Sequence, residues 1–114
     1  MSDKWKKAFT AERKRLNKLV TSSGHLGMKR FFALDEQAYH HAALDARTKE
    51  LMGLAASMVL RCDDCVSYHI IRCFEEGVTR EEFYEAFNVA LIVGGSIVIP
   101  HLRRAAEKVE ALFE

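Results

Sequence analysis

Apolar residues recur every three or four positions along most of this chain, which is the spacing of an amphipathic helix. The pattern predicts a first helix over residues 3–20, with Lys and Arg on its polar face, and residues 21–24 end it. Residues 26–43 predict one short helix, or two that are divided around Asp35 and Glu36. No segment has the convincing pattern of a strand, so the chain is expected to be all-α.

The helix expected over residues 46–61 is apolar on nearly every side, with Asp45 as its N-cap. A helix of this kind is usually central and buried. Glu50 lies inside it, and a buried carboxylate is costly unless it is paired or hydrogen-bonded. Glu50 therefore has either a functional role or a structural one, as the partner of a nearby Arg or as a residue close to the exposed start of the helix.

Start and stop signals divide the second half of the chain. Residues 62–76 predict a helix that Gly77 ends, and Thr79 with Glu82 forms the capping box of the next helix. The residues that this next helix is expected to turn inward are apolar: Phe83, Ala86, Phe87, Ala90, Leu91 and Val93.

Residues 94–96 interrupt that helix, and Pro100 suits the first turn of a last helix that ends near Phe113. Residues 97–99 fit either a short extended link or part of a helix. The chain length of 114 residues indicates one domain, over residues 1–114, of about six helices.

Charge is unevenly distributed, although the net charge is only +1. Residues 1–30 hold nine Lys and Arg against two acidic residues, whereas residues 31–114 hold eight against fourteen. We interpret residues 1–24 as a basic amphipathic helix with a solvated face, which docks on the acidic body of its own or a neighbouring subunit. Because the segment lacks the interleaved aromatic residues of a nucleic-acid binder, we expect neither nucleic acid nor a membrane as a partner.

Neither a signal peptide nor a membrane span is expected. Residues 1–20 lack a continuous apolar core, and no apolar run reaches the roughly 20 residues that cross a bilayer. The expected location is the cytoplasm, where a close cysteine pair is more often catalytic or metal-binding than a structural disulfide.

Cys62, Cys65 and His69 fall within one stripe of the helix expected over residues 62–76. The two cysteines are one turn apart, close enough to form a disulfide, and the imidazole can reach the thiol of Cys65. A helix N-terminus, an imidazole and the Cys-x-x-Cys spacing each lower the pKa of a thiol, whereas Asp63 and Asp64 oppose this effect.

This spacing suits a two-step redox cycle. One thiolate attacks an oxidant or a disulfide, and the other cysteine resolves the product into an intramolecular disulfide. Glu50 and His69 would shuttle the proton. Glu50 can serve the cysteines only if its helix crosses the next one steeply, or if a neighbouring subunit closes the gap.

Two alternatives remain for these residues. Zinc could be held by Cys62, Cys65 and His69, with Asp64, Glu50 or His101 as the fourth ligand. We expect no metal and no cofactor, because structural zinc sites usually pair two such clusters and the chain has no second one. The cysteines could also be ordinary core residues, as we expect for Cys73. Asp64 and His101 stay possible site residues, His101 because it could face the cysteines or contact an anion at a helix start.

The motif Cys62-Asp-Asp-Cys65-Val-Ser-Tyr-His69, preceded by Glu50 and followed by Gly77-Val-Thr79 and Gly94-Gly95, resembles the carboxymuconolactone decarboxylase family. Within that family it is most similar to the alkylhydroperoxidase AhpD-like branch. The resemblance covers residues 35–110. It implies an all-helical fold whose subunits form trimers or hexamers.

The resemblance also implies a role for each site residue. Cys65 matches the attacking cysteine, Cys62 the resolving one, and Glu50 with His69 the proton relay. The implied function is a peroxidase-like, antioxidant reduction of hydroperoxides or disulfides, with a lipoyl-type dithiol as reductant and peroxiredoxins as partners of the family's peroxidases. The best-characterised members have a histidine where this chain has Asp64, so weak peroxidase activity is expected. Lyase chemistry on a small carboxylated lactone is the alternative, which the cysteine pair disfavours.

Overall fold

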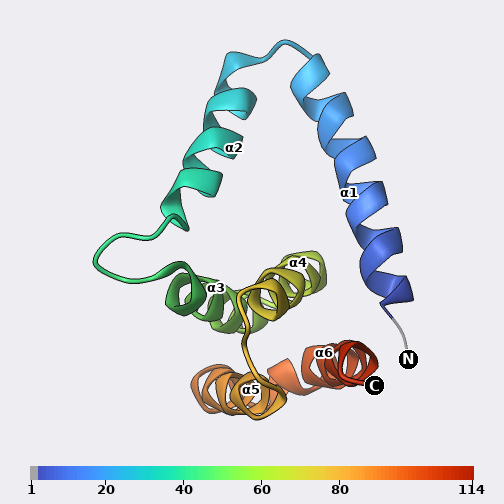
Figure 1. The fold of residues 1–114 in the computed structure, drawn as a ribbon, viewed down its shortest axis with the longest axis vertical. Coiled ribbons are helices and arrows are strands. Elements are labelled where there is room, and N and C mark those ends of the chain that lie inside the picture. The colour runs from blue at the N-terminus through green and yellow to red at the C-terminus, as the bar shows by residue number, and fades with distance from the viewer. Residues whose placement is uncertain (1–2) are drawn as a thin grey trace.

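The computed structural model describes residues 3–114, and Figure 1 shows their fold. Six α-helices and one 3-10 helix follow one another: α1 (Lys4–Ser22), α2 (Leu26–Ala38), α3 (Ala46–Val59), α4 (Asp63–Glu75), α5 (Arg80–Gly94), η1 (Ser96–Val98) and α6 (Ile99–Leu112). The described residues contain no strand, so the predicted all-α fold is confirmed.

The helices form two regions, which we call the body and the arm. The body contains α3, α4, α5, η1 and α6, and the arm contains α1 and α2, which rise from the body as two sides of a triangle (Figure 1). The body's core is apolar and comes from all four of its α-helices: Leu54, Met58, Val66, Ile70, Cys73, Val78, Phe83, Phe87, Ala90, Val98, Ala105, Val109 and Leu112. Since α3 packs against both α4 and α5, its inner face is fixed from two sides.

The predicted helix ends of the body are confirmed. The Asp45 side chain accepts a hydrogen bond from the Thr48 amide at 2.7 Å. Thr79 and Glu82 form the complete capping box. Gly77 has a φ of 82°, in the left-handed region that glycine adopts without a steric penalty.

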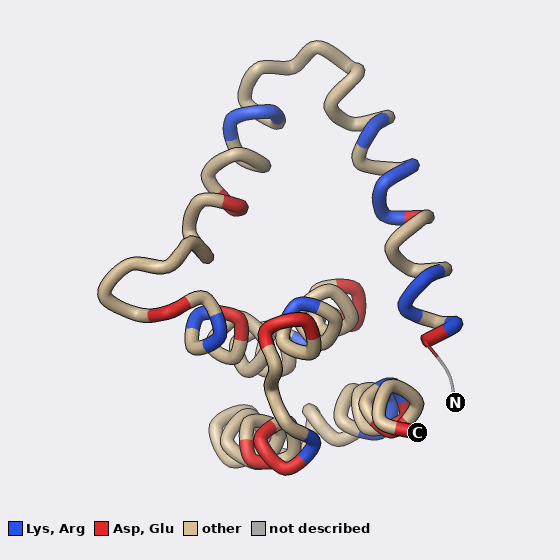
Figure 2. The backbone as a smooth tube through the Cα atoms, viewed as in Figure 1, with Lys and Arg blue, Asp and Glu red and all other residues tan. Residues whose placement is uncertain are grey.

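Unlike the body, the arm has no buried core, because none of the residues in α1 or α2 is buried. It contacts the body from the first half of α1 and from Tyr39, directly after α2. At the start of α1, the Trp5 indole donates to the Lys108 carbonyl at 3.1 Å and Lys6 lies 3.9 Å from Glu75. Figure 2 shows the Lys and Arg residues along α1 and the acidic residues gathered on the body helices.

Several details differ from the sequence-based expectations. Of the one or two helices expected over residues 26–43, the structure has one, α2, which is continuous through Asp35 and Glu36 and ends at Ala38. The expected burial of α3 holds for one side only, since Met52 is 57% exposed. Val93 was expected to face inward but is 69% exposed. Residues 96–98 form η1, which leads directly into α6, so the region that could have been an extended link is helical.

Candidate functional site

A buried acid–base pair joins α3 to α4. The Glu50 carboxylate lies 2.8 Å from Nδ1 of His69, and the two residues are only 1% and 7% exposed. Nε of Arg72, one turn after His69 on α4, lies 3.6 Å from the second carboxylate oxygen. Glu50 is therefore both paired with an Arg and joined to the histidine of the motif, which offsets the cost of burying its charge.

Tyr39 and Gly53 complete the surroundings of His69, and sequence reasoning missed both. The Tyr39 hydroxyl lies 3.3 Å from Nε2 of His69, and the two ring centroids are 5.2 Å apart. A Cβ atom at Gly53 would lie 2.7 Å from Cε1 of His69 and 2.9 Å from the Tyr39 hydroxyl. Only glycine leaves room for the two side chains there. A glycine inside an apolar helix, where it is less stable than alanine, was the one available signal.

The cysteine pair lies at the start of α4. Cys62 is the N-cap of this helix, its Cα is 5.3 Å from that of Cys65, and the two form a disulfide. Sγ of Cys62 also accepts a hydrogen bond from the Cys65 amide at 3.2 Å. Cys65 is exposed and Cys62 is half-buried, so an incoming reagent meets Cys65 first.

Two basic side chains from α6 contact the cysteine turn. Asp63 lies 2.6 Å from Nδ1 of His101 and 2.8 Å from a guanidinium nitrogen of Arg104. Burial raises the pKa of Asp63, but the hydrogen bonds from His101 and Arg104 outweigh it and hold that pKa below its usual value. Of the two places that the sequence allowed for His101, the structure shows it facing the cysteine turn. Asp64, the residue after Asp63, is exposed.

The cysteine turn and the Glu50–His69 pair are not in direct contact. Within residues 3–114, no hydrogen bond joins either cysteine to His69 or Glu50, whose polar atoms are paired with each other, Tyr39 and Arg72. In the described part of the chain, no group of three or more His, Cys, Asp or Glu side chains is placed to hold a metal ion. The residues considered as zinc ligands therefore do not meet at one point.

Cys73 has the surroundings of a core residue. It is fully buried, and burial, followed by the nearby charge of Glu50, raises its pKa to about 12. Its thiol therefore stays protonated at neutral pH and is a poor nucleophile.

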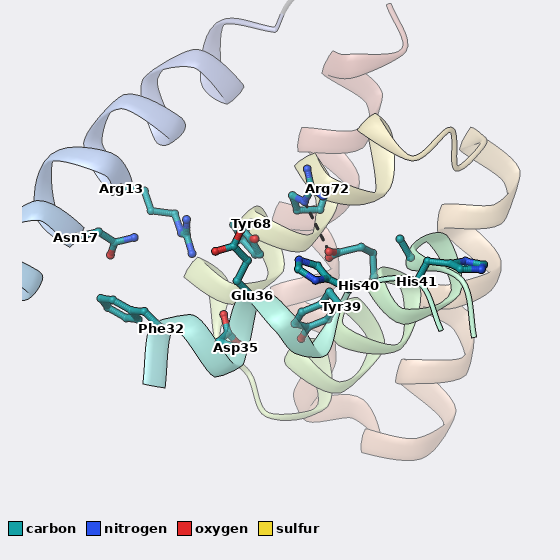
Figure 3. Close-up of a pocket in the computed structure, with 12 residues that line it drawn as sticks. Arg13, Asn17, Phe32, Asp35, Glu36, Tyr39, His40, His41, Tyr68 and Arg72 are labelled. Carbon is teal, nitrogen blue, oxygen red and sulfur yellow. Dashed lines mark ion pairs between the residues drawn. The ribbon is translucent and has the colours of Figure 1, made fainter. Parts of the chain in front are cut away.

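A cavity of about 590 Å³ opens between the arm and the body (Figure 3). Its wall includes Glu50 and Tyr39 from the site, Arg13 from α1, and Tyr68 and Arg72 from α4. The Arg13 guanidinium stacks over the Tyr68 ring, 4.0 Å from its centroid. The cavity reaches Glu50 of the buried pair, and neither cysteine lines it.

Comparison with known proteins decides the family. The sequence model of the carboxymuconolactone decarboxylase family matches residues 26–108. The chain belongs to this family. The match begins at the start of α2 and includes all the candidate site residues, so the family inferred from the motif is confirmed.

Solved structures of relatives share the fold. A carboxymuconolactone decarboxylase family protein from Thermotoga maritima, whose description suggests a part in the antioxidative response, is 57% identical, with a TM-score of 0.88 over 92% of this chain and 89% of that one. The apo structure of a family member from Legionella pneumophila is 33% identical, with a TM-score of 0.74 over 96% and 95% of the two chains.

The relatives also include the alkyl hydroperoxide reductase AhpD of Corynebacterium kroppenstedtii, which is 35% identical over 54 residues. The match covers 47% of this chain and 31% of that protein, so the matched segment spans about a third of the length of AhpD. No helix within residues 3–114 is long and apolar enough to cross a membrane.

Proposed function

We propose that this family member is a cytoplasmic thiol-disulfide oxidoreductase of AhpD-like type, which reduces hydroperoxides or disulfides at the expense of a dithiol. The observation that carries the proposal is the Cys62–Cys65 disulfide at the start of α4, with Cys65 exposed, on the helix whose next turn holds His69 against Glu50 of α3. The relationship to AhpD and the antioxidative description of the Thermotoga relative support the same chemistry.

In the oxidative half of the cycle, the Cys65 thiolate attacks the terminal oxygen of a hydroperoxide. The O–O bond breaks, an alcohol leaves and Cys65 becomes a sulfenic acid. The Cys62 thiol then attacks the Cys65 sulfur, so that a disulfide forms and water leaves. Two thiols have then lost two electrons to one peroxide. Because no hydrogen bond joins the cysteines to His69, the proton that the Cys65 thiol releases passes through water to His69, where the Glu50 carboxylate stabilises the imidazolium. His69 then returns this proton by the same route to the alkoxide, which leaves as the alcohol.

In the reductive half, an external dithiol attacks the exposed Cys65 sulfur and Cys62 leaves as a thiolate. The amide of Cys65 donates to Sγ of Cys62 at the helix N-terminus, an arrangement that favours the charged sulfur. A leaving thiol with a lowered pKa departs faster. A second attack by the dithiol releases both cysteines in reduced form and the reductant as its disulfide.

The peroxidase activity is expected to be weak. The residue before Cys65 is Asp64, an exposed carboxylate. The resemblance to the AhpD-like branch implies a histidine at this position. Negative charge next to a thiol disfavours the thiolate. The charge of Asp63 is matched by His101 and Arg104, which leaves the charge of Asp64 to disfavour the Cys65 thiolate.

The test is a count of reactive thiols before and after one equivalent of peroxide, together with turnover with a dithiol. The wild type should lose two thiols, and Cys65→Ser should lose both disulfide formation and turnover. Cys62→Ser should stop at a sulfenic acid or an intermolecular disulfide. Cys73→Ser is the matched control, since its thiol is buried and should not react. Undiminished turnover in Cys65→Ser would exclude the role given to Cys65, and decarboxylase activity that survives thiol alkylation would support the lyase instead.

We further propose that the protein is a homo-oligomer, a trimer or hexamer. The arm buries none of its residues, yet it exposes apolar side chains that a second subunit could cover: Leu16, Leu19, Val20, Leu26, Met28, Phe31 and Leu34. Light scattering should give a mass of three or six chains, and a monomer at micromolar concentration would contradict the proposal.

A further inference from the structure

The imidazole of His69 is fixed at both of its nitrogen atoms. Nδ1 lies 2.8 Å from Glu50 and Nε2 lies 3.3 Å from the Tyr39 hydroxyl. Gly53 presents no side chain on the remaining side, where Cε1 and Nε2 come closest to α3. The ring therefore has one position that satisfies all three neighbours.

The two partners of the ring decide which nitrogen carries the proton. An ionised carboxylate only accepts hydrogen bonds, so Nδ1 must donate to Glu50. In the neutral ring Nε2 then has a lone pair, and the Tyr39 hydroxyl donates to it. Burial, followed by the charges of Asp35 and Glu50, raises the pKa of Tyr39, which keeps this hydroxyl protonated and able to donate.

Tyr39 comes from the arm, thirty residues before His69 and directly after the end of α2. It is half-buried, whereas every residue of α2 except Phe32 is exposed. The chain after it is tied to α3, because Nζ of Lys49 donates to the His40 carbonyl at 2.7 Å. The hydrogen bond of Tyr39 therefore depends on where the end of the arm docks on the body.

We propose that Tyr39 is a positioning residue of the site, which holds His69 in the Nδ1-protonated form with Nε2 directed to the Tyr39 hydroxyl. Docking of the arm thereby becomes part of the proton relay. This inference rests on the proposed function for what His69 does in turnover, but the geometry of the ring can be measured without turnover.

Tyr68 provides a matched control for the loss of a hydroxyl. Its ring is also in contact with His69, with centroids 5.1 Å apart, and it lines the same cavity. Within residues 3–114, however, its hydroxyl has no hydrogen bond to His69. Tyr39→Phe and Tyr68→Phe therefore each remove a hydroxyl group from a tyrosine that contacts the His69 ring, but only the first removes a hydrogen bond to it.

The experiment is ¹⁵N NMR of the His69 ring in the oxidised protein at a pH where the ring is neutral. In the wild type, Nδ1 should show the protonated signal, and Nε2 should resonate upfield of an imidazole nitrogen that has no hydrogen bond. Tyr39→Phe should move the Nε2 signal downfield, and Tyr68→Phe should not move it. The groups that face the ring during any titration are Glu50, Tyr39, Tyr68 and Arg72, with Asp35 behind Tyr39.

Turnover gives the second readout. Loss of one neutral hydrogen bond should slow the reaction of Cys65 with peroxide roughly two- to tenfold in Tyr39→Phe, with a changed pH profile. An unchanged Nε2 signal in Tyr39→Phe would overturn the inference, whether or not the wild type turns over. If Tyr39→Phe does not fold, the wild type alone tests the inference. An Nε2 signal that is not displaced upfield in the wild type would overturn it. A wild type that shows the displaced signal but no turnover contradicts only the proposed function.

Discussion

The first and second turns of α4 have opposite surroundings, although they belong to one helix. The first turn holds Cys62 and Cys65 at the surface, among charged groups that solvent screens. The next turn holds His69 in the interior, against Glu50 and a glycine that leaves no spare volume. Chemistry that needs access is therefore separated by one helical turn from chemistry that needs a fixed proton position.

The difference in burial between the two turns determines how strongly a substitution in each of them affects stability. A surface turn has water as an alternative partner for every polar group, so single contacts there contribute little. A buried pair has no alternative partner, and removal of one member leaves the other unsatisfied. Substitutions should therefore have large effects around His69 and small ones around the cysteines, apart from the sulfur atoms themselves.

The largest effect is expected for Glu50→Ala. It leaves Nδ1 of His69 buried without a partner and opens a cavity between α3 and α4, so the free energy of unfolding should fall by about 3 kcal/mol. Urea unfolding measures this loss. Glu75→Ala is the matched control, since Glu75 also pairs with Arg72, at 2.7 Å, but lies at the surface. It should cost less than about 1 kcal/mol. Equal losses in the two variants would remove the contrast between buried and exposed positions.

A smaller effect is expected for Gly53→Ala. Alanine normally stabilises a helix relative to glycine by roughly 1 kcal/mol. Here the added methyl group meets His69 and Tyr39 at under 3 Å, and such overpacking typically costs about 1–3 kcal/mol. Thermal unfolding should therefore show a lower Tm, together with slower turnover because the imidazole is displaced.

Gly27 offers the control for that variant. It is the second residue of α2, where a Cβ would meet nothing within 4 Å. Gly27→Ala should raise the stability by up to roughly 1 kcal/mol, as propensity alone predicts. A Gly53→Ala variant that gains stability in the same way would show that the ring of His69 is not tightly held.

The local part of this site followed from the sequence. The spacing of Cys62, Cys65 and His69 places them on one helix whatever the rest of the chain does, and the caps Asp45 and Thr79 act within one turn. Tyr39 and Gly53 could not be found in this way, because their proximity to His69 depends on how α2 and α3 are placed in space.

The exposure of apolar residues also escaped prediction for a physical reason. A helical pattern shows which residues share a face, but it does not show whether that face packs on its own chain. Val93 and Met52 lie on apolar faces and remain exposed in the single chain. The same holds for the arm, whose apolar residues the pattern identified without indicating that none is buried.

The smallest effect is expected at the cysteine turn, for Asp63→Asn. Because the folded state holds the pKa of Asp63 below its ordinary value of 3.8, the contribution of this carboxylate is complete above that value. It is lost as the pH falls through the lower, folded pKa. The wild type should therefore lose a little more stability between pH 6 and pH 3 than Asp63→Asn does, as measured by urea midpoints at both pH values. A large loss in Asp63→Asn at pH 6 would show that the cysteine turn is held as tightly as His69, and that the two turns of α4 are not different in kind.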